Sequence, residues 1–184
     1  RSGELQTSAS WEECHRDLGD ATSRLFAEAY DPTGIDVAAL VGALPPTCCA
    51  VVLDRPDPDR PEQLVRAIVP GGDLSRAEVE HVVLPATALR LLELLTGPGR
   101  LLVDIKSTLC SHDLAPLTRP FLGRLADDLL SPEAPRDLLI IPSGGLWAVP
   151  FAGLPLTGPQ GSTALIEQTS ITLAPSLRFH DLAA

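Results

Sequence analysis

The chain has 184 residues, of which 45% are apolar and 21% are charged, and its formal net charge is −10. This length favours one domain with a sizeable core, and the apolar fraction excludes intrinsic disorder as the main state. The apolar runs are too short for a membrane span, and the acidic balance argues against a nucleic-acid-binding domain, which needs a basic face.

The first 34 residues predict a helical segment. Between residues 11 and 30, apolar side chains recur at steps of three and four and so indicate an amphipathic helix, with Cys14, Leu18, Ala21, Leu25 and Ala29 on one side. Charged residues are available for the wet side. Proline and glycine at 32 and 34 end this helix, and residues 35–44 predict a second, short one.

The pattern then changes to that of a β-hairpin. Residues 47–53 form a short apolar run typical of a buried strand, and residues 63–70 predict its partner across a charged, proline-rich loop at 54–61. A turn at 71–73 leads into a short helix from Leu74. His81 is placed in the loop before Val82.

The second half predicts alternating helices and strands. Helices are expected at 86–95 and 112–130, the latter with an apolar stripe of Leu114, Leu117, Phe121, Leu125 and Leu129. Residues 138–141 predict a buried strand of the parallel type, and the alternation over 167–174 predicts another. Pro175-Ser176 offers an N-cap for a last helix from Leu177. The fold class is therefore α/β, with a mixed sheet flanked by helices.

Two motif blocks stand out in the last quarter of the chain. The first block is an apolar strand, a Pro-x-Gly turn, a leucine before a large residue, and Pro-Phe, found at 138–141, Pro142, Gly144, Leu146-Trp147, Pro150-Phe151 and Leu154. The second block is Leu-Ile-Glu, a strand and Pro-Ser, found at 165–167, 171–174 and Pro175-Ser176. Together the two blocks resemble the CHAT domain, the caspase-like module related to separase. The chain differs from the family pattern at Ser143, often aspartate, and at Trp147, often histidine.

The resemblance implies a caspase-like fold, divided here into an N-terminal helical segment (1–34) and the front portion of a CHAT domain (35–184). The family's catalytic histidine and cysteine follow the Pro-Ser helix, within which this chain stops, so no catalytic residue is expected in it. A chain that starts with Arg1 and has no methionine also indicates a piece of a longer protein. The missing strands are expected to leave strand 138–141 partly unpaired and the isolated piece poorly soluble.

The function implied is that of a non-catalytic front part of a bacterial CHAT-family cysteine endopeptidase, supporting the sheet that carries a downstream His/Cys dyad. Its expected partners are the rest of its own domain, a protein substrate and a regulatory protein, without nucleic acid or membrane. The alternative is a catalytically inactive CHAT-like scaffold, and a more distant one is a free-standing regulatory domain. No cofactor or metal is predicted. The arginine-rich composition favours a bacterial source.

The cysteines are interpreted as structural. Cys14-His15 are helix neighbours about 100° apart and cannot form a dyad. Cys48 and Cys49 are expected on opposite faces of a strand, one packed inward and one outward. Cys110 and His112 lack further metal ligands. With no C-x-x-C spacing among the four cysteines, a reduced, cytoplasmic protein is predicted.

The other candidates also have a structural interpretation. Ser143-Gly144-Gly145 follows a strand but lacks G-x-S-x-G and the phosphate-binding lysine pattern, so a tight turn is favoured. Trp147 and Phe151 are expected to anchor that turn on the core, with a substrate-groove role for Trp147 as the alternative. The lone histidines His81 and His180 are taken as structural or solvated. The pairs Glu12-Glu13 and Asp127-Asp128 are interpreted as solvated helix faces.

Overall fold

The computed structural model describes residues 36–57, 59–96 and 114–176. The predicted helix at 11–30, the start of the helix predicted from His112, and the helix predicted from Leu177 lie outside these residues. Of the helices in the described ranges, none has the length and apolar character needed to cross a bilayer.

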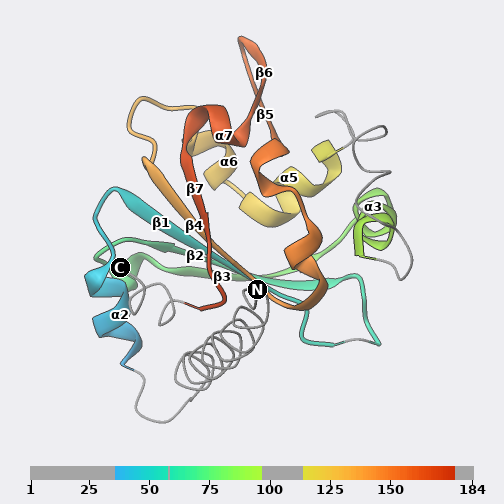
Figure 1. The fold of residues 1–184 in the computed structure, drawn as a ribbon, viewed down its shortest axis with the longest axis horizontal. Helices are drawn as coiled ribbons and strands as arrows, with labels where there is room; N and C mark the ends of the chain where they lie inside the picture. The colour runs from blue at the N-terminus through green and yellow to red at the C-terminus, as the bar shows by residue number, and fades with distance from the viewer. Residues whose placement is uncertain (1–35, 58, 97–113, 177–184) are drawn as a thin grey trace, which may run out of the picture.

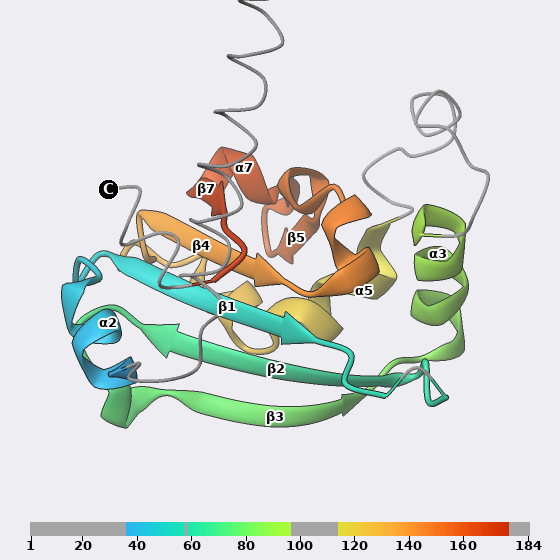
Figure 2. The same ribbon diagram turned by 60° about the horizontal axis from the view of Figure 1, so that its bottom comes forward.

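A five-stranded mixed sheet organises the fold, in the order β3-β2-β1-β4-β7 (Figures 1 and 2). The predicted hairpin is confirmed: β1 (Cys48–Asp54) pairs antiparallel with β2 (Gln63–Pro70). On its other side β1 pairs parallel with β4 (Asp137–Pro142), which in turn pairs parallel with β7 (Ser170–Leu173). The predicted α/β class with a mixed sheet is therefore confirmed.

Strand β3 (Glu78–Val83) is the edge strand that the sequence interpretation missed. It pairs antiparallel with β2, and His81, which was placed in a loop, lies inside it opposite Val65. The segment EVEHVV alternates only as far as Glu80, because His81 follows on the valine face and Val82 on the glutamate face, so it carries no clear strand pattern.

Three helices cover one face of the sheet, called here the helix face: α3 (Ala86–Thr96), α5 (Ala115–Leu122) and α6 (Leu125–Asp128) (Figure 2). The predicted stripe from Leu114 to Leu129 is buried there, each member at most 5% exposed. The single helix predicted over 112–130 is divided in two, because Gly123 has a φ of +56° that no continuing helix adopts.

The opposite face, called here the α2 face, is covered at one end by α2 (Val37–Ala43). Asp36 caps this helix by accepting a hydrogen bond from the Ala39 N–H at 3.1 Å. Val41 and Leu44 pack on the sheet beside Cys48. Cys48 and Cys49 do belong to opposite faces, but the expectation that one points outward is wrong: both are buried, because each face is covered at this point.

After β4 the chain makes two 3-10 turns, Gly144–Ala148 and Phe151–Gly153. A small hairpin of β5 (Pro155–Gly158) and β6 (Gly161–Ala164) follows, which the sequence interpretation missed. The strand predicted from residue 167 begins only at Ser170, since α7 (Leu165–Gln168) occupies its start. The expectation of a partly unpaired strand 138–141 is wrong: β4 is paired on both sides, and β7 is the sheet's edge.

Candidate functional site

The parallel strands β1, β4 and β7 direct their carboxyl ends to one edge of the sheet. In open α/β sheets, binding and catalytic groups gather at this edge, because the loops that leave parallel strands meet there. We call it the carboxyl edge. The loops that form this edge begin directly after Asp54, Pro142 and Leu173, the last residues of the three strands.

The turn after β4 is held firmly against this edge. The Ser143 N–H donates to the Leu53 carbonyl at 2.9 Å, and the Ser143 hydroxyl accepts a hydrogen bond from the Arg55 N–H at 3.3 Å. Gly144 has a φ of +49°, and a Cβ on Gly145 would stand 3.2 Å from the Thr96 Cβ at the end of α3. The glycines thus provide a left-handed conformation and a close approach to α3, as a tight turn requires.

His81, the histidine among the described residues, cannot activate Ser143. His81 lies on β3, and two strands separate β3 from β4 in the sheet. At a spacing of ~4.8 Å between neighbouring strands, His81 is far outside hydrogen-bond reach of Ser143. The interpretation of Ser143 as part of a turn and not as a nucleophile agrees with this placement.

Trp147 and Phe151 have different environments, although both were expected to anchor the turn. Phe151 is 2% exposed and its ring centroid lies 5.7 Å from that of Phe121. Trp147 is 43% exposed, so for this residue the anchoring expectation is wrong. An exposed tryptophan beside the carboxyl edge is instead available to a ligand or to another part of the protein.

The two described cysteines are not nucleophiles. Burial raises the pKa of the Cys49 thiol to about 12, with a smaller contribution from the neighbouring Cys48. Burial, followed by the negative charge of Asp137, also raises the pKa of Cys48. The thiolate is the reactive form, so both side chains stay protonated and inert near neutral pH. They pack as small apolar groups.

Several sequence candidates lie outside the described residues: Glu12-Glu13, Cys14-His15, Cys110 with His112, and His180. Within the described ranges, no three or more His, Cys, Asp or Glu side chains cluster as metal ligands would. Asp127 and Asp128 are exposed, as expected of a solvated face. Asp127 forms a bidentate ion pair with Arg119, which lowers the pKa of the carboxyl and raises that of the guanidinium.

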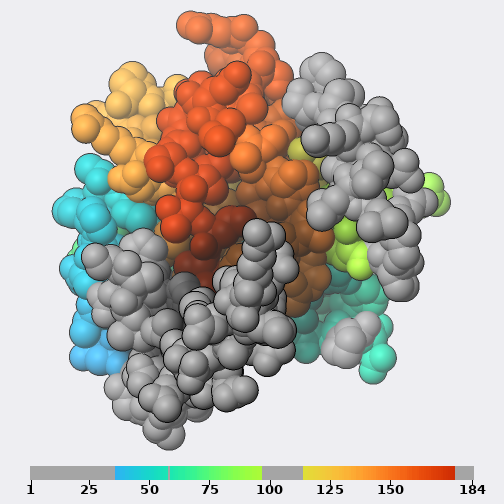
Figure 3. Space-filling model, viewed as in Figure 1, coloured from blue at the N-terminus to red at the C-terminus, as the bar shows by residue number. Residues whose placement is uncertain are grey.

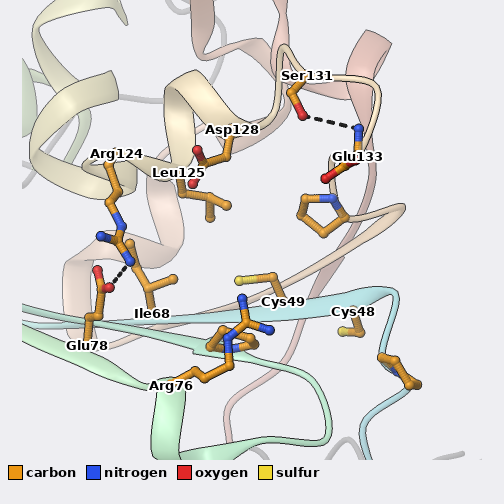
Figure 4. Close-up of a pocket in the computed structure, with 13 residues that line it drawn as sticks. Cys48, Cys49, Ile68, Arg76, Glu78, Arg124, Leu125, Asp128, Ser131 and Glu133 are labelled. Atoms are coloured by element: carbon orange, nitrogen blue, oxygen red, sulfur yellow. Dashed lines mark hydrogen bonds and ion pairs between the residues drawn. The ribbon is translucent and has the colours of Figure 1, made fainter.

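A polar cavity of about 440 Å³ lies at the opposite, amino end of β1 and β4 (Figure 4). Cys48, Cys49 and Ile68 line it from the sheet, and charged side chains surround them: Arg76, Glu78, Arg124, Asp128 and Glu133. Arg124 is engaged by an ion pair with Glu78, and the Ser131 hydroxyl accepts from the Glu133 N–H at 3.1 Å. Five chain segments contribute these residues, so no local motif could have indicated the cavity.

Arg66 is a further feature that the sequence interpretation missed. It is 6% exposed, on the helix face of β2. Its Nη1 donates to the carbonyls of Arg119 at 2.8 Å and Pro120 at 2.7 Å, and its Nη2 pairs with Glu80. Arg66 therefore caps the carboxyl end of α5, where helix carbonyls lack intrahelical partners. We interpret it as a structural residue.

The comparisons with known proteins agree with this architecture. The family model described as the CHAT domain matches residues 110–184, a range that includes α5, α6, β4, the turn at Ser143 and β7. No curated protein matches the chain. The family match covers both motif blocks of the sequence and confirms the resemblance drawn from them. Over residues 110–184 the chain is therefore similar to the CHAT domain family.

Proposed function

We propose that this region is the front part of a CHAT-family cysteine endopeptidase and forms the sheet on which a His/Cys dyad is assembled. The observation that carries the proposal is the position of β7. It is the last strand of the sheet in the described structure, and it lies parallel to β4 and β1. A further strand added to its outer edge would deliver its carboxyl end, and a catalytic residue there, to the same edge as Ser143 and Trp147.

The surface of β7 supports this role. All but one of its four residues are exposed, and Leu173 is 43% exposed. Figure 3 shows β7, in red, at the surface of the molecule. An exposed strand edge with apolar side chains is a template for pairing, and folded proteins usually cover one.

The catalytic thiolate would also have to come from a cysteine other than Cys48 and Cys49. A cysteine peptidase needs a thiolate, a histidine that takes its proton and donors for the oxyanion. The thiols of Cys48 and Cys49 are buried with raised pKa, and Cys48 lies at the amino end of β1, opposite the carboxyl edge. The described residues would then supply a rigid support and, through Trp147, an apolar contact for a protein substrate.

We further propose that the parent protein is bacterial and cytoplasmic, and that a partner protein or cleavage of the chain controls its activity. The two described cysteines are free, in keeping with a reducing compartment.

The test is to label the protein that carries this chain with a thiol-reactive peptide probe and to map the label by mass spectrometry. We expect rapid labelling of a cysteine other than Cys14, Cys48, Cys49 and Cys110. Cys48→Ala and Cys49→Ala are the matched controls and should leave the labelling rate unchanged. Label confined to those four cysteines would show the peptidase proposal to be wrong. A failure of any cysteine to react would favour the alternative, a CHAT-like scaffold without catalysis.

A further inference from the structure

The edge strand β3 has its polar and apolar faces reversed relative to an ordinary solvated edge. Its glutamates point to the helix face, where Glu78 pairs with Arg124 and Glu80 with Arg66. On the α2 face, Val79 is 66% exposed and Val83 is 72% exposed, more than any other large apolar side chain in the described residues. A strand that faces water on one side normally places its polar residues there.

Val79 continues an apolar row that begins in the core, and Val83 lies beside Gln63 of β2. The register places Val79 beside Ala67 of β2, Ala67 beside Val52 of β1, and Val52 beside Ile141 of β4. Ile141 is buried in the α2-face cluster, whereas Val52 and Ala67 are only partly buried. The α2-face core therefore runs out midway across the sheet. We call the uncovered part the apolar strip: Val52, Val65, Ala67, Val79 and Val83. The exposed His81 lies on the same face between the two valines of β3, opposite Val65.

We propose that the segment 11–30 of this chain docks on the apolar strip as an amphipathic helix. The predicted apolar side of this helix includes Leu18 and Leu25, which can pack against the exposed apolar side chains of the strip. Isolated helices gain most of their stability by packing an apolar face, so the segment and the strip would each remove the other's exposed surface from water.

The connection between the two favours this occupant over a separate molecule. The 35 residues that precede Asp36 lead directly into α2, which itself packs on the α2 face. The link of residues 31–35 is short, with a reach of at most about 18 Å, so a helix ending at residue 30 stays close to the sheet. A helix of this length spans ~30 Å, and five strands span only ~19 Å, so one helix suffices to cross the sheet.

The test measures how fast a cysteine at position 79 reacts with a maleimide in the full chain. Val79→Cys is compared with Ser162→Cys on the exposed strand β6, and labelling is quantified per peptide by mass spectrometry, so the native cysteines remain. We expect position 79 to react at least about tenfold more slowly than position 162, because the docked helix must open first. The buried thiol of Cys49 should stay unlabelled in every variant and so reports that the core is folded.

A matched pair of variants identifies the occupant. Leu18→Asp with Leu25→Asp places charge on the predicted apolar side and should raise labelling at position 79 to the rate at 162. Arg24→Asp, on the predicted wet side, makes the same change in net charge and should leave the protection intact. Labelling at 79 as fast as at 162 in the parent chain would overturn the proposal. Protection that survives the double variant, or that grows with protein concentration as a second copy requires, would overturn it as well.

Discussion

The two faces of the sheet are closed to different degrees. Among residues 36–57, 59–96 and 114–176, α3, α5 and α6 with the turns after β4 complete a helix-face cluster of 25 buried side chains, whereas the α2-face cluster has eight. Both faces are built on the same strands, and β1 and β4 bury side chains on each. The difference therefore comes from what covers the strands and not from the strands themselves.

The helix face and the α2 face differ in what they contribute to the fold. Hydrophobic stabilisation grows with the apolar area removed from water, so most of what the described residues contribute must come from the helix face. The α2 face and the outer edge of β7 expose apolar side chains of the described residues, which further chain could bury.

The largest expected effect is on the helix face. Phe121→Ala removes a fully buried ring that packs against Phe151, and it should lower the free energy of unfolding by about 3–5 kcal/mol, measured by urea denaturation of the full chain. Should that variant fail to fold, Ile140→Val on the same face is the milder probe, with an expected loss of about 1 kcal/mol.

Val37→Ala, in α2, truncates a side chain that lies outside the α2-face cluster. Val37 is 48% exposed, so this change should cost less than ~1 kcal/mol. An equal loss from Val37→Ala and Phe121→Ala would show that Val37 is not exposed as described.

The sequence predicted the elements whose burial follows a simple period. The run CCAVVL and the run LLII gave the two central strands, and the stripe from Leu114 to Leu129 gave the helix-face layer. In these segments the period of the apolar residues matches the face on which they are buried, although Gly123 divides the helix and both cysteines of β1 are buried.

The elements that were missed depend on long-range contacts. Strand β3 has exposed valines and inward glutamates, and those glutamates are satisfied only because Arg66 and Arg124 meet them from β2 and from the α5–α6 junction. The cavity lined by Arg76 and Asp128 likewise gathers residues far apart in the chain. Of the candidate site, the turn at Ser143 was predicted from its glycines, whereas the exposure of Trp147 was not, since a tryptophan's amphipathic ring fits either environment.

A smaller effect on the helix face is expected at Gly123, between α5 and α6. Its φ of +56° disfavours any side chain, and a Cβ would stand 2.5 Å from the Arg66 Nη2. Gly123→Ala should therefore lower the free energy of unfolding by about 1–2 kcal/mol. Because the alanine Cβ would clash with the Arg66 side chain, the two sites should be coupled. The double variant Gly123→Ala with Arg66→Met should therefore lose less free energy of unfolding than the sum of the two single variants. Strict additivity would show that backbone strain alone accounts for the loss.

The smallest expected effect, of opposite sign, is in α2 on the less covered face. Gly42 lies inside this seven-residue helix, and a Cβ built there meets no atom within 4 Å. Gly42→Ala should raise the free energy of unfolding by about 0.5–1 kcal/mol, because alanine has less backbone freedom to lose on folding and favours the helix. Gly161→Ala is the control: its Cβ also meets nothing, but its φ of +120° should make the change destabilising. A loss of stability at Gly42 as well would mean that the outer side of α2 is already covered, and the contrast between the faces would then be smaller than the described residues indicate.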